Sequence, residues 1–499
     1  MSYHVRFTTS FITLAAAFVA TSLSASDPID DFYGPNQVQE IHLGIAAADL
    51  QLMLQALPER VYIPASFRWR DTEFSNVAIR YKGNSSSNRQ SPFKRSYLIK
   101  FDEYDKEARF LGLRRVSLDN GIQFGSLFSE PIVTEILRAE GVVSHRANYA
   151  KLFVNGDYQG VYVNVERIDE SFMANHLPDP NGSLFKCDEG GPGCNLQFIG
   201  DSRTNYKKAF ERKARTSKED ADQLIEFIRM INQSSPEDVA ERIEAELELD
   251  DFLRTMAVLL FAGAFDQLTG WNPHNYYLYR DNERNRWRYL PWDLDVGFSE
   301  TAFGRIKVLE HWHAAWPVPT SGSENPLLER IINNPDLLRR YRHEARRILD
   351  EHFHPDRLTK VLDAKYALIQ QDLQNDPFPH RRATSRHEED YDQIVASIKD
   401  FVRKRYTAAR QQLAEPGERP KRMHPPQGPS EQLAGKIRQL QEGARRVQRS
   451  GGEFAPIETL MRQIGPLIQT QKYQQAEELI DQALKLIDEE LGDARLDCP

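Results

Sequence analysis

The chain has 499 residues, of which 64 are Lys or Arg and 73 are Asp or Glu, giving a formal net charge of −9. This acidic balance argues against a general affinity for nucleic acid, so we expect no nucleic-acid partner. After the N-terminal segment, no stretch approaches the ~18–20 apolar residues that cross a bilayer, and we expect no stable membrane span.

Residues 1–26 have the pattern of a secretory signal peptide. Arg6 provides a weakly basic start, an apolar core runs from Phe11 to Val19, and small residues precede Asp27. We therefore predict that the mature chain is exported, to the periplasm, the cell surface or the medium.

The part from 38 to 200 is predicted to be rich in strands. A hairpin is expected from Tyr149 to Glu166, because strand-like sequences flank the turn Asn155-Gly156-Asp157. Just before it, residues 126–140 are predicted to form a helix that ends at Gly141.

Three cysteines are few for an exported chain of this length. Cys187 and Cys194 bracket a glycine-rich loop, so in an oxidising compartment they are expected to close a small disulfide rather than bind a metal.

Residues 82–86 form a turn of small residues, Lys82-Gly83-Asn84-Ser85-Ser86. The backbone N–H groups of such a turn can approach phosphate oxygens, although ordinary hairpin turns have the same composition. Lys100 lies further on, in the predicted strand 96–101, among apolar residues. Its ammonium group either reaches an edge of the sheet or is held by a carboxylate, for which Glu130 and Glu135 both remain candidates.

The part from 201 to 414 is predicted to be mainly helical, with one aromatic-rich hairpin at residues 275–290 that turns at 281–285. We expect Asn275 to lie opposite Pro291, which places Asp293 one diagonal step away, at roughly 7–8 Å. Asp295 shares that face if the segment stays extended. Carboxylate and amide oxygens are the ligands of hard cations such as Mg²⁺, so these three residues predict a metal site. The alternative is a buried hairpin with solvated acidic ends.

Asp266 follows the apolar helix predicted at 258–265 and precedes a polar loop. A carboxylate in this position can orient and deprotonate an acceptor hydroxyl. The alternative is a helix-end residue that accepts hydrogen bonds from loop amides.

Residues 415–430 carry five prolines and several charges, which indicates a linker. In residues 431–491, apolar side chains at helical spacing predict a helix from Tyr473 to Leu491, with an earlier helix near 457–469 to pair with it. We expect a helical hairpin that serves for docking a partner or for self-association.

Three groups of residues resemble one known family. They are Ile79–Ser86 with Lys94–Phe101, then Gly160–Glu166, and finally Asn272–Tyr279 with Tyr289–Phe298. In this order they resemble the CotH family of atypical protein kinases, first known from spore coats, over roughly residues 38–410.

The resemblance implies an α+β fold of the two-lobed, protein-kinase-like kind, in which a strand-rich lobe precedes a helical lobe. It implies that ATP and Mg²⁺ or Mn²⁺ are used to phosphorylate Ser or Thr of a protein substrate. Asp266 matches the family's catalytic aspartate, and Asn275, Asp293 and Asp295 would hold the metal. The turn at 82–86, Lys100 and Glu166 would contact the nucleotide.

The sequence departs from ordinary kinases at two points. It has no His-Arg-Asp triplet, and Asp293-Leu294-Asp295 stands in place of Asp-Phe-Gly. We expect Asp293 to be the principal metal ligand, with Asp295 assisting. Two alternatives remain open: a kinase-fold transferase of another chemistry, such as nucleotidyl transfer or carboxylate activation, and a non-catalytic surface adhesin.

Overall fold

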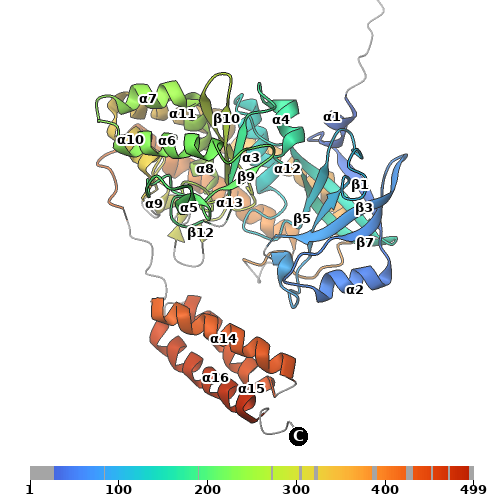
Figure 1. Ribbon diagram of the computed structural model, residues 1–499. Helices are drawn as coiled ribbons and strands as arrows, with labels where there is room; N and C mark the ends of the chain where they lie inside the picture. The colour runs from blue at the N-terminus through green and yellow to red at the C-terminus, as the bar shows by residue number, and fades with distance from the viewer. Residues whose placement is uncertain are drawn as a thin grey trace, which may run out of the picture.

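The computed structural model describes residues 27–493 except 84, 189, 271–272, 303–305, 320–323, 385–389, 423–430, 451–452 and 470–471. The predicted signal segment therefore lies outside the described residues, as does Asn84 of the predicted phosphate turn. The architecture is α+β, as predicted, with a closed barrel, a smaller sheet, a helical part and a C-terminal bundle (Figure 1).

The barrel contains seven strands in the order β1-β2-β3-β4-β5-β7-β6. Their bounds are β1 Val38–Gly44, β2 Ile63–Trp69, β3 Thr72–Lys82, β4 Ser96–Lys100, β5 Arg115–Asp119, β6 Ala147–Val154 and β7 Asp157–Val165. β1 closes the barrel by pairing in parallel with β6, whereas the other neighbours are antiparallel. In β2, burial alternates residue by residue, so every second side chain points into the barrel. Phe67, Phe101 and Phe110 form part of the aromatic core there.

Short helices complete this part of the chain: α1 Pro28–Phe32, α2 Ala47–Gln55, the 3₁₀ turn η1 Ser85–Ser87, and α3 Ser129–Ala139. The predicted hairpin of β6 and β7 is confirmed, with Val154 paired to Asp157. The predicted helix is confirmed as α3, which begins three residues later than expected.

A second sheet has four strands in the order β11-β10-β8-β9. Their bounds are β8 Ser183–Cys187, β9 Glu211–Lys213, β10 Tyr276–Asp281 and β11 Arg286–Pro291. The predicted aromatic hairpin is confirmed as β10 and β11, but its register differs by one residue, because Tyr276 and not Asn275 pairs with Pro291. Asn275 has a φ of +57°, which is outside the strand conformation. β8 joins this sheet, so the division expected near residue 200 runs through one structural unit.

Helices surround the second sheet and share one core with it. They are α4 Glu170–His176, α5 Arg203–Tyr206, α6 Asp220–Gln233, α7 Val239–Glu246, α8 Leu249–Ala262, α9 Val308–His311, α10 Pro326–Asn333, α11 Pro335–His352, α12 Pro355–Leu373 and α13 Tyr391–Ala414, with the short strands β12 Thr301–Ala302 and β13 Ile306–Lys307. α8 is buried along most of its length. Among the described residues, no helix combines the length and apolar character needed to cross a membrane.

A buried ion pair ties the segment after α12 to the barrel. Lys94 Nζ donates to Asp376 Oδ2 at 2.6 Å and to the Val161 carbonyl at 2.8 Å. Gly160 lies beside this pair with a φ of +94°, and a Cβ there would collide with the Asp376 carboxylate. The residue at 160 must therefore be glycine for the two charges to meet.

The C-terminal unit has three helices and not the expected two: α14 Glu431–Ser450, α15 Ala455–Gln469 and α16 Tyr473–Asp493. Their apolar faces form a core of their own, which includes Leu440, Ile464 and Ile480. Figure 1 shows this bundle standing apart from the rest of the chain.

Candidate active site

A lysine and an aspartate meet at one end of the barrel. β4 lies between β3 and β5, and Lys82 at the end of β3 is paired with Ser96 at the start of β4. Across β4, Lys82 Nζ donates to Asp119 Oδ2 at 2.6 Å, at the end of β5. Three neighbouring strand ends thus bring a cation and an anion together.

The electrostatic environment keeps both groups charged. Burial alone would lower the pKa of Lys82, but the negative charges of Asp119 and Asp293 outweigh it, so the pKa is raised. Burial alone would raise the pKa of Asp119, but Lys82 and local hydrogen bonds bring it below the ordinary value. Lys82 is therefore a fixed positive charge close to Asp293.

The segment Asp293-Leu294-Asp295 follows β11 and is held through its backbone. The Leu294 N–H donates to Glu130 Oε2 at 2.8 Å, and Ser129 Oγ donates to the Leu294 carbonyl at 2.6 Å. Both contacts come from the start of α3, while the Leu294 side chain is buried in the core. Asp293 has a φ of +60°, so the segment turns and does not meet the condition of an extended backbone under which Asp293 and Asp295 would share a face. The buried leucine separates two aspartates at the site.

Burial and neighbouring acids favour the neutral, protonated form of both aspartates. Burial raises the pKa of Asp293 to about 7, with Asp119 and Glu130 adding to the effect while Lys82 opposes it. Burial also raises the pKa of Asp295 well above its usual range, with Asp293 as the next cause. Two carboxylates in this situation ionise together most easily beside a cation, and carboxylate and amide oxygens, such as those of Asp293, Asp295 and Asn275, are the donor types that Mg²⁺ and Mn²⁺ take.

Asp266 lies in the loop after α8, which ends at Gly263 in the left-handed conformation. Asn275 Nδ2 donates to Asp266 Oδ2 at 3.1 Å, and His274 Nε2 lies 3.1 Å from Asp266 Oδ1. The side chain of Asp266 is 34% exposed and Asn275 is only 4% exposed. Asp266 also contributes to the raised pKa of Asp295. The structure thus brings the four predicted catalytic and metal residues into one cluster.

Two basic side chains border this cluster. Lys186 Nζ is 2.6 Å from Asp188 Oδ1, and its charge acts on Asp293. The Arg167 guanidinium lies 5.0 Å from the centre of the Trp292 ring and acts on Lys82 and Lys186. The cluster therefore has cations on its border as well as acids at its centre.

Sequence reasoning missed Asp119, Glu130 as a backbone acceptor, Arg167, Lys186 and His274. Of these five, only His274 could have been found from the sequence, because it is the residue directly before the predicted metal ligand Asn275. The other four come from strand ends and a helix start that are distant in sequence and are joined only by the fold.

The expected pairing of Lys100 is corrected. Lys100 Nζ donates to Glu103 Oε2 at 2.5 Å, whereas Glu130 bonds His145 and Glu135 bonds Lys365. Lys100 ends β4 four residues beyond Ser96, roughly 13 Å along the strand from the end that carries Lys82. The position expected for Lys100 beside the metal residues is taken by Lys82.

Glu166 has a structural role that the sequence did not reveal. Its side chain is fully buried, and its carboxylate accepts hydrogen bonds from the Arg146 backbone N–H, from Arg146 Nε at 2.9 Å and from Arg146 Nη2 at 2.6 Å. His176 Nε2 lies 2.9 Å away. Burial alone would raise the pKa of Glu166, but His176 and Arg146 lower it to about 2. These contacts occupy the carboxylate, which corrects its expected assignment as a nucleotide contact.

The predicted phosphate turn begins at Lys82 and continues directly from the end of β3. Gly83 is exposed with a φ of +76°, and Ser85 and Ser86 belong to η1. The Ser96 N–H donates to Ser86 Oγ at 2.6 Å, so the turn is anchored to the start of β4. Phosphate binding by this turn stays a prediction.

The cysteine pair differs from expectation. Cys187 and Cys194 are buried free thiols, with Cys187 Sγ 3.8 Å from the Pro273 carbonyl and Cys194 Sγ 3.5 Å from that of Ala209. Burial raises the pKa of the Cys187 thiol, and Cys194 adds to this. Both side chains belong to the hydrophobic core, Cys187 at the end of β8 and Cys194 in the loop that follows it.

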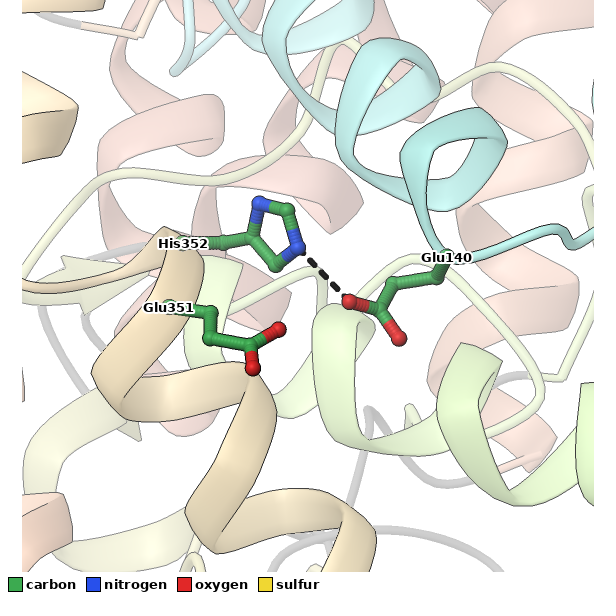
Figure 2. A group of neighbouring side chains, drawn as sticks. All are labelled: Glu140, Glu351 and His352. Atoms are coloured by element: carbon green, nitrogen blue, oxygen red, sulfur yellow. Dashed lines mark hydrogen bonds and ion pairs between the residues drawn. The ribbon is translucent and has the colours of Figure 1, made fainter.

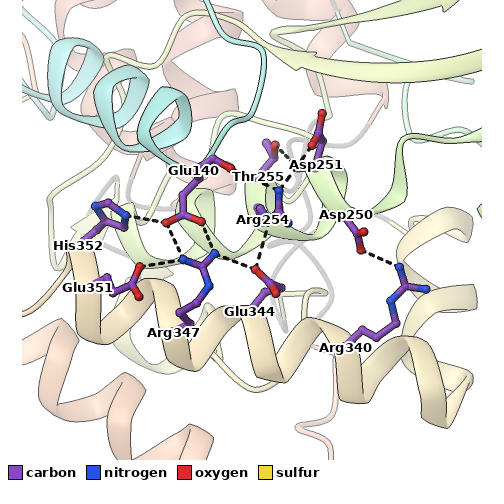
Figure 3. Close-up of polar contacts among 10 residues, drawn as sticks. All are labelled: Glu140, Asp250, Asp251, Arg254, Thr255, Arg340, Glu344, Arg347, Glu351 and His352. Carbon is purple, nitrogen blue, oxygen red and sulfur yellow. Dashed lines mark hydrogen bonds and ion pairs between the residues drawn. The ribbon is translucent and has the colours of Figure 1, made fainter.

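A second acidic and imidazole cluster lies between α3 and α11. Figure 2 shows Glu140 facing His352, with Glu351 beside it. Figure 3 shows that the Arg347 guanidinium already contacts Glu140, Glu344 and Glu351. Because an arginine supplies the positive charge there, we assign no metal to this cluster.

Comparison with known proteins identifies a family for the larger part of the chain. The pattern of a family described as CotH kinase protein matches residues 79–409, which includes every residue of the cluster above. "Inner spore coat protein H" of Bacillus subtilis (strain 168) is 23% identical over 329 residues, covering 65% of this chain and 85% of that protein. "Spore coat protein homolog 1" of Rhizopus delemar is 22% identical over 258 residues, covering 50% of this chain and 40% of that protein.

Proposed function

Because the chain belongs to the CotH kinase protein family, we propose that it is a protein kinase that transfers the γ-phosphate of ATP to Ser or Thr of a protein, with Mg²⁺ or Mn²⁺. The observation that carries the proposal is the meeting of Asp266, Asn275, Asp293 and Asp295 beside the Lys82–Asp119 pair. Phosphoryl transfer needs a bound cation, a basic side chain at the phosphates and a group that orients the acceptor, and this cluster offers one candidate for each.

Asp293 is the principal metal ligand in this proposal, with Asn275 and Asp295 completing the protein's share of the oxygen donors. The cation neutralises charge on the phosphates when it is bound. The negative charges of Asp119 and Asp293 both favour the charged form of Lys82. In the proposal its ammonium group turns toward a phosphate, while Asp119 keeps it charged.

Asp266 is the proposed acceptor base. Its partial exposure lets a hydroxyl from another protein reach it, and His274 and Asn275 fix its carboxylate by contacts at 3.1 Å on each oxygen. The carboxylate accepts the hydroxyl proton as the oxygen bonds to the γ-phosphorus, and ADP leaves.

The barrel and the helical part would then serve as the two lobes of a kinase-like fold, with the site at their junction. The signal pattern at residues 1–26 and the spore-coat names of the two relatives support an exported protein at a coat or cell surface.

The test is metal-dependent label transfer by the purified chain, with γ- and α-labelled ATP in parallel and casein as the added acceptor. Transfer of the γ label that is lost in Asp266→Asn and Asp293→Asn would support the proposal. Asp336→Asn, an exposed aspartate on α11, is the matched control and should retain activity. Transfer of the α label would show nucleotidyl transfer instead, and no metal-dependent ATP binding would leave a binding protein.

A further inference from the structure

The second sheet has two edges that differ in how they are covered. At β11, Leu247 bridges to Trp287 and the Glu248 N–H donates to the Trp287 carbonyl at 2.8 Å, so the turn before α8 covers that edge. At β9, no further strand pairs on the outer side within the described part of the chain. An edge strand with open backbone groups is a template for an added strand.

Basic side chains gather on and beside this open edge, in residues 207–215, which we call the basic edge. Its cations are Lys207, Lys208, Arg212, Lys213 and Arg215, and its one acid is Glu211. The segment carries a clear positive excess in a chain whose net charge is −9. Lys207, Lys208 and Arg212 are exposed.

Most of this positive charge is not neutralised within the protein. Lys213 pairs with Glu211, and Arg215 Nη1 donates to the neutral amide of Asn181 at 3.3 Å. Among the described residues, Lys207, Lys208 and Arg212 make no ion pair.

The basic helix α11 provides a contrast. Arg340 contacts Glu244 and Asp250, and Arg347 contacts Glu140, as Figure 3 shows in part. These arginines of α11 are balanced by acids of neighbouring elements, whereas Lys207, Lys208 and Arg212 are not. Within the described residues, the basic edge is therefore a surface whose positive charge is available for a partner.

The register of the sheet connects this edge to the site. Tyr277, Lys186 and Glu211 lie opposite one another on three successive strands, so their side chains share one face. Lys186 is the residue on this face whose charge acts on Asp293. A strand added to β9 would lie roughly 10 Å from β8, and half of its side chains would share the face of Lys186.

We propose that the basic edge docks an extended acidic segment of the acceptor protein, which pairs with β9 as a fifth strand. Backbone hydrogen bonds would hold the segment, and Lys207, Lys208 and Arg212 would contact its carboxylates. The proposal rests on the proposed function only in identifying the docked chain as the acceptor.

The test measures peptide binding to the full mature chain without nucleotide, by fluorescence anisotropy. The probe is a labelled peptide of about ten residues, the upper strand length in globular proteins, that alternates Glu with Val. One control peptide has Lys in place of Glu, and another is N-methylated at alternate amides, which removes strand pairing but keeps the charge. We expect binding of the first peptide and weakening by about tenfold or more for both controls, since charge and pairing both contribute.

Charge-reversal variants test whether the peptide binds at the basic edge. Lys208→Glu with Arg212→Glu should weaken the acidic peptide by about tenfold or more, because like charges then face each other. Arg445→Glu with Arg446→Glu makes the same charge change on the exposed face of α14 and should leave binding unchanged. Equal binding of the N-methylated peptide, or equal loss in both double variants, would overturn the proposal. Because no ATP is present, a failure of phosphoryl transfer leaves this result intact, and a failure of docking leaves the kinase test intact.

Discussion

Replacing Glu166 by glutamine should cost stability and leave nucleotide binding unchanged. The buried carboxylate holds the Arg146 guanidinium by two hydrogen bonds and also contacts His176. Glutamine keeps the shape of the side chain but removes the charge, and one of its two terminal atoms becomes a donor that faces donors. The variant therefore leaves Arg146 buried with a weaker partner.

The magnitude follows from the pKa of Glu166, which is about 2 in the fold against an ordinary 4.5. At 1.36 kcal/mol per pH unit, this difference corresponds to about 3 kcal/mol of folding free energy at neutral pH. Because the folded pKa is the lower one, this stability is present above pH 4.5 and is lost as the pH falls through the folded value. The gap between wild type and variant should therefore shrink to about 1.5 kcal/mol at pH 3.

Urea unfolding followed by tryptophan fluorescence at pH 7 and at acidic pH measures both quantities. Glu103→Gln is the control, because its pair with Lys100 is at the surface, and it should change stability by less than about 1 kcal/mol. An unchanged unfolding midpoint in Glu166→Gln together with a large loss of ATP affinity would refute the structural role and restore a nucleotide contact.

Three further predictions follow from the site and the core. Lys82→Met should weaken ATP binding by about tenfold or more, while Lys100→Met should change it little. Calorimetry with Mg²⁺ and ATP measures both affinities, and a larger loss in Lys100→Met than in Lys82→Met would contradict the placement of the site. Asp376→Asn should destabilise the chain by about 3–5 kcal/mol, because it leaves the buried Lys94 without its counter-ion. A shift of the urea midpoint equivalent to less than about 1 kcal/mol would contradict this. In a Cys498→Ser chain, Cys187 and Cys194 should react with a thiol reagent only after unfolding, and no reaction in that unfolded, unreduced chain would show a disulfide instead.

The sequence predicted what depends on local patterns. The hairpin of β10 and β11, the hairpin of β6 and β7, and the helix at α3 all follow from periodicity and turn residues. The grouping of Asn275 with Asp293 also follows, since both flank one hairpin, although the register differed by one residue because Asn275 has a positive φ.

Contacts between distant elements were not predictable in this way. Lys82 and Lys100 are both lysines at strand ends, and only the direction of β3 and β4 in the closed barrel decides which one faces Asp293. Glu166 ends a strand, as a surface residue can, yet its burial depends on Arg146 and His176 in other elements. The additional helix of the C-terminal bundle, α14, was missed because its sequence is mostly polar and rich in arginine, with few apolar residues on the face that packs in the bundle.

The ion pair between Lys94 and Asp376 has a consequence for the order in which the chain matures. The two residues are 282 positions apart, and the lysine is 3% exposed in the finished structure. Until the segment after α12 has been synthesised, the barrel has the residues for all seven strands, but Lys94 in its wall lacks its counter-ion. Since an uncompensated buried charge is strongly destabilising, the barrel should remain loose and open to proteases until then. Truncated chains that end before 376 should accordingly be cleared, so that the cell accumulates only molecules in which the helical part is present to complete the barrel.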